Sequence, residues 1–444
     1  MNERVFNANK ERIKSILKKA KKTLFYSEMF EAIDLDIENL TYREFCRIPL
    51  LTKDIYKDNI FNMLSKDIDI RNLGKIESLA EKRKILEDHG MLLKITSGST
   101  GKPIEVIKTQ RDYTQDYLML NYYRRKWSSY SFKGKFLWIW PVNPIIRKFL
   151  YSDAEEDRLI EINEYGEQYM LYEHSDENFE SICNIIVKDN IEWITSSPSV
   201  LAELCDYMRR NSIIIKNIKY IESHSEFLYE WQRKKIIDVF GINPISIYSS
   251  NEIQFIAKEE CGGAYELMDK TSYVEFVENE YGQKEICVTS LNYVDIPIIR
   301  YKLGDCGHWA VDINKGDNHF FFFLDGFRTN DFVIKRGGTR VEPFIITDSM
   351  LICCKKFQFT VEWYKVIQTG YENFKYIIVV KKNEDLKQEM KDFLSKYLSA
   401  ILGYNIDVEI EIQELNILNY EGWKYRYFSL DKKFLELHIN GGKV

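Results

Sequence analysis

Glycine and proline are scarce in this sequence of 444 residues, with 21 and 8 copies, and no stretch is rich in either residue. Disordered linkers and tails are typically enriched in these residues and poor in aromatic ones. Tyrosine and phenylalanine are instead abundant, with 29 and 26 copies. The composition therefore predicts an ordered globular chain, long enough to bury a substantial core and to form roughly two to three domains.

The cysteine and histidine patterns of metal sites and disulfide frameworks are also absent. The eight cysteines include no CxxC pair, and Cys353 and Cys354 are adjacent, which is a poor spacing for a structural disulfide. The six histidines show no HExxH spacing. We therefore expect reduced, buried thiols and no zinc site.

A strong positive charge and a long apolar segment are missing as well. The 62 basic residues are outnumbered by 68 acidic ones, which gives a net charge of −6 and no field that would attract nucleic acid. No apolar run reaches the roughly 18 residues of a membrane span, and no signal-peptide core begins the chain. We expect no nucleic-acid partner, no membrane span and a cytoplasmic location. Ile13, Ile16, Leu17 and Ala20 form a helical stripe that favours packing on the core over docking on a membrane surface.

The segment 96–103, Thr-Ser-Gly-Ser-Thr-Gly-Lys-Pro, combines flexible backbone, hydroxyl groups and one cation. Its glycines let backbone amides turn toward an anion, the hydroxyls add donors, and Lys102 adds a positive charge. Only two residues separate Gly98 from Gly101, which excludes a P-loop. The flanking residues 91–95 and 103–109 are predicted strands. Taken alone, the segment is equally compatible with a phosphate-binding loop and with a surface hairpin turn.

Strands and helices alternate between residues 135 and 249. Strands are predicted over 135–141, 192–195, 218–222 and 244–249, and helices over 177–189, 199–210 and 227–240. Ser197 and Pro198 supply a cap and a first-turn proline for the second helix. The alternation predicts an α/β fold whose mostly parallel sheet is covered on both faces.

The later part of the chain changes its pattern twice. Shorter strands at 272–277, 285–289, 307–312 and 319–324 predict an antiparallel or barrel-like part. Strands near 356–368 and 375–381, a helix over 385–402 and a strand over 406–412 then predict a small α+β domain. We therefore divide the chain into a large amino-terminal domain, 1–325, and a small carboxyl-terminal domain, 326–444.

Two further segments carry side chains suited to nucleotide chemistry. Residues 248–252, Tyr-Ser-Ser-Asn-Glu, lie where a predicted parallel strand ends, the edge at which open α/β sheets bind ligands. Glu252 is a candidate magnesium ligand, and Tyr248 is placed to stack on a base. Residues 300–305, Arg-Tyr-Lys-Leu-Gly-Asp, put Asp305 in a predicted tight turn, where a carboxylate would accept hydrogen bonds from ribose hydroxyls. Each also has a structural alternative, as a turn carboxylate or a core tyrosine.

The ordered set of segments resembles the adenylate-forming ligase superfamily, in particular the branch with phenylacetate-coenzyme A ligases and capsule-biosynthesis proteins. The resemblance covers most of the chain. The matching segments are 49–53 (the Pro-x-Leu-Thr-Lys entry segment), 96–103 (the phosphate loop), 196–199 and Glu226 (further blocks), 248–252 (Tyr-Gly-x-Thr-Glu), 300–305 (Arg-Tyr-x-x-Gly-Asp) and 328–337 (the hinge motif).

The resemblance implies that ATP and a small carboxylic acid give an acyl adenylate and pyrophosphate. The acyl group would then pass to coenzyme A, a carrier protein, an amine or a hydroxyl. The implied nucleotide-binding residues are Ser97, Gly98, Ser99, Thr100, Gly101 and Lys102 for the phosphates, Tyr248 for adenine, Glu252 for magnesium, Asp305 for the ribose and Arg328 beside the nucleotide. A hinge near 328–331, with Asn330 and Asp331, would let the small domain rotate between two half-reactions.

The family's carboxyl-terminal lysine has no direct match. Its Arg-Ser-x-Gly-Lys pattern corresponds only to residues 419–426, Asn-Tyr-Glu-Gly-Trp-Lys-Tyr-Arg, which place Trp423 at the lysine position and Lys424 one residue later. A slip of one residue in a loop makes Lys424 a displaced catalytic lysine. In a strand the same slip turns it to the opposite face, as an ordinary solvated residue. Both alternatives stay open.

We therefore expect an ATP-dependent, magnesium-dependent ligase that activates an acid, with Lys424, Glu252 and Arg328 in catalytic roles. The competing hypothesis is a catalytically degenerate protein of the same fold, which binds nucleotide or a partner enzyme. The sequence does not identify the acid or the acyl acceptor, and a homodimer remains an open alternative.

Overall fold

A computed structural model of the chain describes residues 1–64, 76, 79–96, 104–141, 159–163, 166–172, 174–260, 262–279, 282–311, 319–328, 333–338, 340–341, 344–357, 363–380, 387–414, 428–431 and 433–434. The chain divides into two compact units. The first comprises Met1–Leu303 and His308–Phe323, and the second comprises Gly304–Gly307 and Leu324–Val444.

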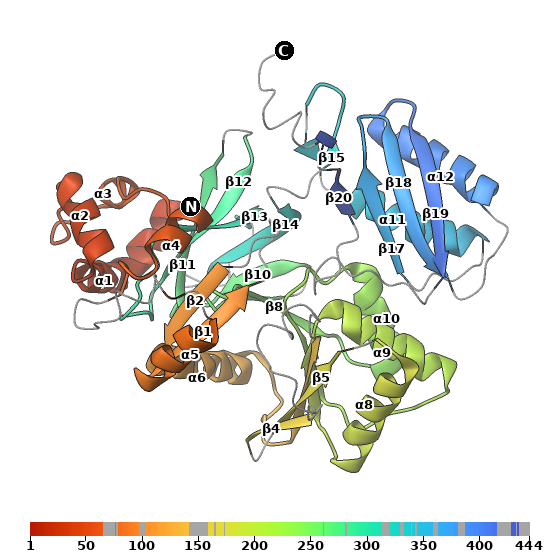
Figure 1. Cartoon of the computed structure of the whole chain (residues 1–444), viewed down its shortest axis with the longest axis horizontal. Coiled ribbons are helices and arrows are strands. Elements are labelled where there is room, and N and C mark those ends of the chain that lie inside the picture. The colour runs from red at the N-terminus through yellow and green to blue at the C-terminus, as the bar shows by residue number, and fades with distance from the viewer. Residues whose placement is uncertain are drawn as a thin grey trace. The chain divides into compact units, whose positions relative to one another are not determined.

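The first unit begins with short helices, drawn in red in Figure 1: α1 (Asn2–Ala20), α2 (Leu24–Ala32), α3 (Tyr42–Cys46) and α4 (Lys53–Asn59). Threonine hydroxyls at the N-caps of α2, α3 and α4 accept backbone N–H groups from the first turns, a favourable way to begin a helix. The stripe Ile13, Ile16, Leu17 and Ala20 is buried, and α1 packs beside β11 (Ser272–Glu278). The expectation that this stripe packs on the core is confirmed.

A sheet of twelve strands runs through the first unit and continues into residues of the second, in the order β11-β12-β13-β14-β10-β9-β8-β7-β6-β3-β5-β4. Its parallel part contains β3 (Phe136–Pro141), β5 (Gly166–Leu171), β6 (Trp193–Ser196), β7 (Tyr220–Ser223) and β8 (Ile245–Ser249), with β4 (Leu159–Asn163) antiparallel at the edge. The predicted parallel strands are therefore confirmed.

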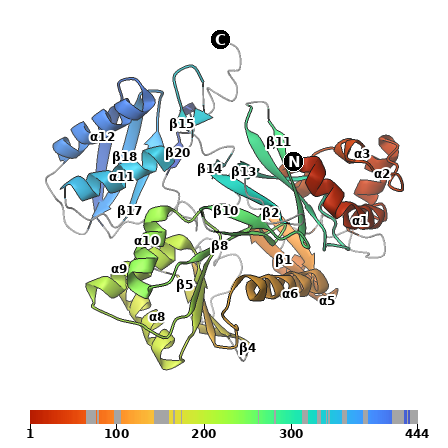
Figure 2. The ribbon, with the colours of Figure 1, turned by 180° about the vertical axis from the view of Figure 1, so that it is seen from behind.

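Helices cover both faces of this parallel part (Figure 2). On one face, α8 (Asp176–Lys188), α9 (Pro198–Arg210) and α10 (Glu230–Phe240) bury an apolar core with Leu137, Ile139 and Ile221 of the sheet. On the other face, Leu120 and Tyr123 of α6 (Gln110–Trp127) pack against Ile247. Pro198 begins α9 as predicted. Helix α10 begins three residues later than predicted, where the Gln232 side chain accepts the Tyr229 N–H at 3.0 Å.

The antiparallel part of the sheet contains β9 (Phe255–Glu259), β10 (Ala264–Leu267), β11, β12 (Lys284–Ser290), β13 (Tyr301–Trp309) and β14 (Phe321–Arg328). One prediction here was wrong in position. The strand expected over 307–312 begins at Tyr301, so Asp305 lies within a strand and not in a tight turn. Gly304, with φ of 83°, allows the strand to continue through a backbone conformation that other residues rarely adopt.

A separate antiparallel hairpin of β1 (Met91–Thr96) and β2 (Ile104–Thr109) packs against α5 (Leu79–Asp88). Thr96 is paired with Ile104, so the two ends of the connection 97–103 lie side by side. The prediction that the glycine-rich segment joins two strands is confirmed. Helix α6 follows β2 directly and is capped by the Thr109 hydroxyl, which accepts the Asp112 N–H at 3.1 Å.

The second unit is an α+β structure. Its four-stranded sheet has the order β19-β18-β17-β20, formed by β17 (Trp363–Gln368), β18 (Asn373–Val380), β19 (Asp407–Glu414) and β20 (Phe428–Leu430). Helices α11 (Phe344–Phe357) and α12 (Lys387–Leu402) pack on this sheet, and the short strands β15 (Val333–Ile334) and β16 (Arg340–Val341) form a hairpin.

The helix α11 was missed, because residues 356 and 357 were predicted to begin a strand. The segment is rich in isoleucine, which favours strands when judged by propensity alone. In the structure Ile346, Met350 and Cys353 recur with helical spacing and are fully buried in the core of the second unit. Tertiary packing therefore overrides local propensity at this helix.

Candidate functional site

The phosphate-loop hypothesis can be examined only through the hairpin that holds it. Ser97, Gly98, Ser99, Thr100, Gly101 and Lys102 lie in the connection 97–103, outside the described residues. The hairpin itself is well anchored. Lys82 of α5 forms an ion pair of 2.8 Å with Glu105 of β2, and Val106 and Ile107 are buried. The base of the hairpin is therefore held in place, and contacts of residues 97–102 with phosphate stay a prediction.

Glu252 lies in a turn directly after β8, at the carboxyl-terminal edge of the parallel strands, as predicted. The turn is closed by the Ser250 N–H, which donates to the Ile253 carbonyl at 3.1 Å, and by the Ile253 N–H, which donates to the Ser250 hydroxyl at 2.9 Å. The Glu252 side chain is buried, with 6% exposed, and its Oε1 accepts a hydrogen bond of 2.7 Å from the Tyr301 hydroxyl. A neutral donor therefore fixes the orientation of this carboxylate.

No described lysine or arginine forms an ion pair with Glu252. Its described hydrogen bond comes from the neutral Tyr301 hydroxyl, and Lys108 acts on it through charge without forming a described ion pair. A buried carboxylate is costly unless it is paired or coordinates a metal. Carboxylate oxygens are ligands that magnesium prefers. The residue present therefore fits the predicted metal-binding role.

Tyr248 lies near the end of β8, where its ring centroid is 6.2 Å from that of Tyr265 and 6.1 Å from that of Phe322. The side chain is partly buried. Aromatic neighbours at edge-to-face angles hold the ring in one orientation. The geometry agrees with a ring that could contact a base, and the adenine contact itself stays a prediction.

The segments 49–53 and 300–305 are brought together. The Leu51 N–H donates to the Arg300 carbonyl at 3.0 Å, and the Lys302 N–H donates to the Leu51 carbonyl at 2.9 Å. These bonds tie the amino-terminal helices to the strand that carries Tyr301. Leu51 also pairs with Tyr301 in a parallel bridge. The entry segment therefore supports the residue that holds Glu252.

The described hydrogen bonds of the Arg300 side chain are all made to other parts of the protein. Its guanidinium forms two hydrogen bonds with Glu275, at 2.7 and 3.2 Å, and donates to the carbonyls of Cys46 and Ile48. Arg300 and Glu275 are 6% and 1% exposed. This paired geometry is the strong form of an arginine and carboxylate contact. The arginine of this motif is therefore a structural clamp.

Two other family-like segments also meet. The Glu226 carboxylate accepts the Ser199 N–H at 3.3 Å, at the start of α9, and the His224 N–H donates to the Ser196 carbonyl at 3.1 Å. An acidic side chain at a helix N-terminus satisfies a free N–H and complements the helix dipole. This segment therefore has a clear structural role.

Asp305 lies in the part of β13 that belongs to the second unit. Arg328 ends β14, and its side chain is not among those described. Lys424, Trp423, Asn330 and Asp331 lie outside the described residues. Their roles stay predictions.

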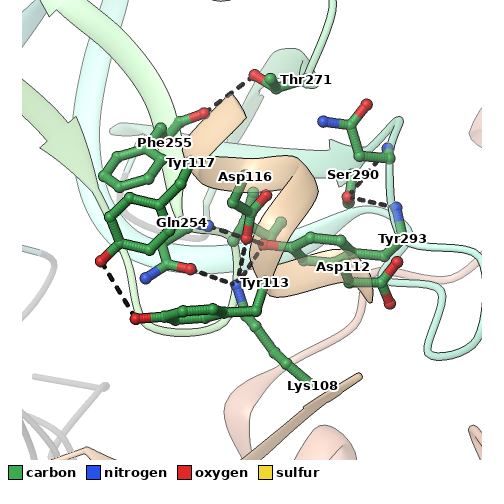
Figure 3. A network of polar contacts seen from close by, with 12 residues as sticks. Lys108, Asp112, Tyr113, Asp116, Tyr117, Gln254, Phe255, Thr271, Ser290 and Tyr293 are labelled. Atoms are coloured by element: carbon green, nitrogen blue, oxygen red, sulfur yellow. Dashed lines mark hydrogen bonds and ion pairs between the residues drawn. The ribbon is translucent and has the colours of Figure 1, made fainter. Parts of the chain in front are cut away.

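Sequence reasoning missed a buried polar cluster next to Glu252, formed by Lys108, Asp116 and Tyr293 (Figure 3). Lys108 Nζ lies 3.0 Å from Asp116 Oδ2, and both side chains are almost completely buried. Burial lowers the pKa of Lys108, while Asp116 acts in the opposite direction. The sequence did contain an indication of this cluster. Lys108 lies two residues after the apolar Val106, and side chains two residues apart in a strand point to the same face, so Lys108 could have been predicted to be buried.

Among the described residues, no helix is long and apolar enough to cross a membrane. No group of three or more His, Cys, Asp or Glu side chains is arranged as a metal site in the same part of the chain.

Comparison with known proteins gives a fold-level relationship. No protein-family model matches the chain. Protein CapK of Staphylococcus aureus is 22% identical over 399 residues, covering 88% of this chain and 81% of CapK. The crystal structure of 2-hydroxyisobutyryl-CoA ligase, in the postadenylation state with R3-HIB-AMP, superposes with a TM-score of 0.67 at 13% identity, covering 98% of this chain and 91% of the ligase.

An anthranilate CoA ligase in complex with anthranoyl-AMP is a further structural neighbour, with a TM-score of 0.51 and 12% identity over 76% of this chain and 65% of the ligase. These neighbours are AMP-forming acyl and aryl ligases, the group that the motifs resemble. At such identities the similarity establishes the fold and leaves the activity to be tested. This chain has the fold of the adenylate-forming ligases.

Proposed function

We propose that this protein activates a small carboxylic acid with ATP, forming an acyl adenylate and pyrophosphate, and then transfers the acyl group to a thiol such as that of coenzyme A or a carrier protein. The observation that carries the proposal is the buried Glu252 carboxylate. It lies at the carboxyl-terminal edge of the parallel strands, is held by Tyr301 and has no described cationic partner. Relatives of this fold crystallised with acyl-AMP molecules support the same chemistry.

In the first half-reaction a carboxylate oxygen of the acid would attack the α-phosphorus of ATP. The new bond joins this oxygen to phosphorus, and the bond to the β-phosphate bridging oxygen breaks, so pyrophosphate leaves with the electron pair. The attack brings one anion to another, so positioned cations and donors are the main source of rate. Ser97, Gly98, Ser99, Thr100, Gly101 and Lys102 would hold the β and γ phosphates.

Glu252 would hold magnesium, which when bound supplies positive charge beside the phosphates. Tyr301 would keep the carboxylate in place by its hydrogen bond to Oε1. Tyr248 would contact adenine and Asp305 the ribose. Arg328 would lie beside the nucleotide, and Lys424 would supply positive charge during adenylation. In the second half-reaction the thiol sulfur attacks the acyl carbonyl carbon, and AMP leaves.

The division of the chain suits two half-reactions. Residues 1–325 would bind ATP and the acid, and residues 326–444 would form a mobile domain that turns about 328–331. Each unit has its own buried core, which is what independent movement requires. The mobility and the position of the hinge are parts of the proposal.

The alternative is a degenerate protein that binds nucleotide without turnover, and it is favoured by Trp423 at the aligned lysine position. Exchange of labelled pyrophosphate into ATP, measured over a panel of aliphatic and aromatic acids, separates the two. Exchange that is lost in Lys424→Ala and kept in Lys433→Ala supports catalysis through Lys424. Calorimetric binding of ATP without exchange for any acid supports the alternative. Absence of ATP binding refutes both.

A further inference from the structure

The hydroxyl of Tyr293 is the centre of the buried cluster in Figure 3. It donates to Asp116 Oδ2 at 2.7 Å and accepts from the Gln254 N–H at 3.1 Å and from Lys108 Nζ. A phenol hydroxyl has one donor and two acceptor sites, so all three are used. The Tyr293 ring is 3% exposed. The hydroxyl therefore has no remaining capacity for solvent or ligand.

The three partners of this hydroxyl come from three different segments. Lys108 belongs to β2 of the phosphate-loop hairpin, and Asp116 belongs to α6. Gln254 follows the turn that carries Glu252 by two residues. Tyr293 itself is fixed by its N–H, which donates to the Ser290 hydroxyl at 3.2 Å. One atom thus joins the hairpin of the loop to the segment of the candidate magnesium ligand.

The Gln254 side chain makes the same connection a second time. In one orientation its amide oxygen lies 3.4 Å from Lys108 Nζ. With the amide rotated by 180°, the oxygen accepts from Lys94 Nζ of β1 at 2.9 Å and the nitrogen donates to Asp116 Oδ2 at 3.0 Å. Both orientations link Gln254 to a lysine of the hairpin. The link between the two segments therefore does not depend on which orientation is taken.

A buried network of this kind is rigid because its members are satisfied only together. Moving the hairpin away from the Glu252 turn would break the bonds of Lys108 to Tyr293 and to Gln254, and would leave the ammonium group short of partners among buried side chains. Unpaired buried polar groups cost far more than paired ones gain. Small displacements between phosphate-binding groups and a metal ligand have large effects on rate.

We infer that Tyr293, Lys108 and Asp116 are positioning residues that fix the distance between the phosphate-loop hairpin and the Glu252 turn. The inference rests on the proposed function, since it concerns how magnesium-bound ATP is held. It assigns no contact with substrate to these residues. Their effect is exerted on the loop residues 97–102 through the hairpin and on Glu252 through the turn.

The test is Tyr293→Phe, which removes one oxygen atom and keeps the ring. Tyr123→Phe is a matched control, because the buried Tyr123 hydroxyl also donates to a carboxylate, Asp269, at 2.7 Å and accepts a backbone N–H, that of Lys270, at 3.0 Å. Magnesium-dependent ATP binding is measured by calorimetry, and the KM for the acid by pyrophosphate exchange. Amide hydrogen exchange is followed in peptides covering 91–96, 104–109 and 250–254.

We expect Tyr293→Phe to weaken magnesium-ATP binding about tenfold relative to Tyr123→Phe, with the KM for the acid unchanged. Hydrogen exchange should rise in the hairpin and in the 250–254 segment together, and in neither for Tyr123→Phe. Asp116→Asn, a second variant, should give the same pattern. Equal effects of the two tyrosine variants, or faster exchange in only one segment, would overturn the inference.

The failure of the proposed function is distinguishable from the failure of this inference. If the wild-type protein binds ATP but shows pyrophosphate exchange with no acid, the adenylation proposal is refuted. The comparison of ATP binding by Tyr293→Phe and Tyr123→Phe still tests the positioning role. The hydrogen-exchange comparison needs no ligand. If the wild-type protein does not bind ATP, the network has no role in nucleotide binding and the inference is overturned. Faster amide hydrogen exchange of Tyr293→Phe in both the hairpin and the 250–254 segment would then show only that the network holds these two segments together.

Discussion

Replacement of Arg300 by methionine should destabilise the first unit strongly without acting at the site directly. Its guanidinium joins the sheet residue Glu275 to the carbonyls of Cys46 and Ile48. Its backbone has φ of 53°, a left-handed conformation that costs a residue other than glycine roughly 1–2 kcal/mol. Such a conformation persists only where surrounding contacts enforce it. The clamp supplies those contacts.

The expected loss follows from what the methionine leaves behind. Glu275 is 1% exposed, and a buried charge that loses its partner costs about 3–5 kcal/mol. The two carbonyls that lose their donor add to the loss, at about 1 kcal/mol each where they stay dry. With both carbonyls counted, we therefore expect a decrease of about 5–7 kcal/mol in the free energy of unfolding. The double variant Arg300→Met/Glu275→Leu should recover most of it, since no buried charge remains.

The assay is urea unfolding followed by tryptophan fluorescence and circular dichroism. Arg210→Met is the matched control, because Arg210 also forms an ion pair of 2.7 Å, with Asp176, but the two side chains are 36% and 64% exposed. Exposed pairs contribute about 0–1 kcal/mol. If Arg300→Met costs no more than Arg210→Met, or if the double variant is as unstable as the single one, the clamp does not have the role that its geometry indicates.

Three shorter predictions follow. Burial, with a smaller effect of Lys108, lowers the pKa of Lys94 from 10.5 to about 7. The unfolded chain then holds more protons between these pH values, so the free energy of unfolding should rise with pH across this window, by up to about 1.4 kcal/mol per pH unit from Lys94. Lys94→Met should reduce the rise in urea titrations at pH 7 to 10 and leave the part that Lys108, whose pKa is also lowered, contributes. Glu252→Gln keeps an acceptor for Tyr301 and removes the charge, so pyrophosphate exchange should fall about a hundredfold or more while the melting temperature changes little; unchanged exchange would exclude a metal role. Met350→Ala, fully buried in the second unit, should cost about 2–5 kcal/mol there and leave ATP binding by the first unit unchanged in calorimetry.

The sequence predicted those features that depend on local pattern. The alternation around Ile194 and Ile221 indicated buried parallel strands, because both faces of such strands are covered. The turn carrying Glu252 was placed correctly because it follows the last strand of the alternating series. Helix α11 was missed because its isoleucines favour a strand by propensity, whereas packing in the core of the second unit holds them in a helix. The network around Tyr293 was missed because the bonds of the Tyr293 hydroxyl span 39 to 185 residues along the chain.

Membership in a motif does not determine what a residue does. Arg300 and Glu252 both belong to segments that resemble the ligase family, yet they differ in how far their bonding capacity is used. The Arg300 guanidinium is engaged by Glu275 and two carbonyls, which leaves it little capacity for a ligand. Glu252 receives one hydrogen bond from a neutral donor and forms no ion pair among the described residues.

The groups proposed for nucleotide binding and the lysine proposed for turnover belong to different parts of the chain. Glu252, which would bind magnesium, and the hairpin that carries the predicted phosphate loop belong to the first unit, where the Tyr293 hydroxyl joins their segments. The group that would raise the rate, Lys424, belongs to the second unit and differs by one position from the family pattern. A protein with an intact first unit and a misplaced lysine would bind ATP tightly and release pyrophosphate slowly. Binding by itself therefore cannot establish the reaction, and the comparison of Lys424→Ala with wild type in pyrophosphate exchange is the measurement on which the enzymatic assignment depends.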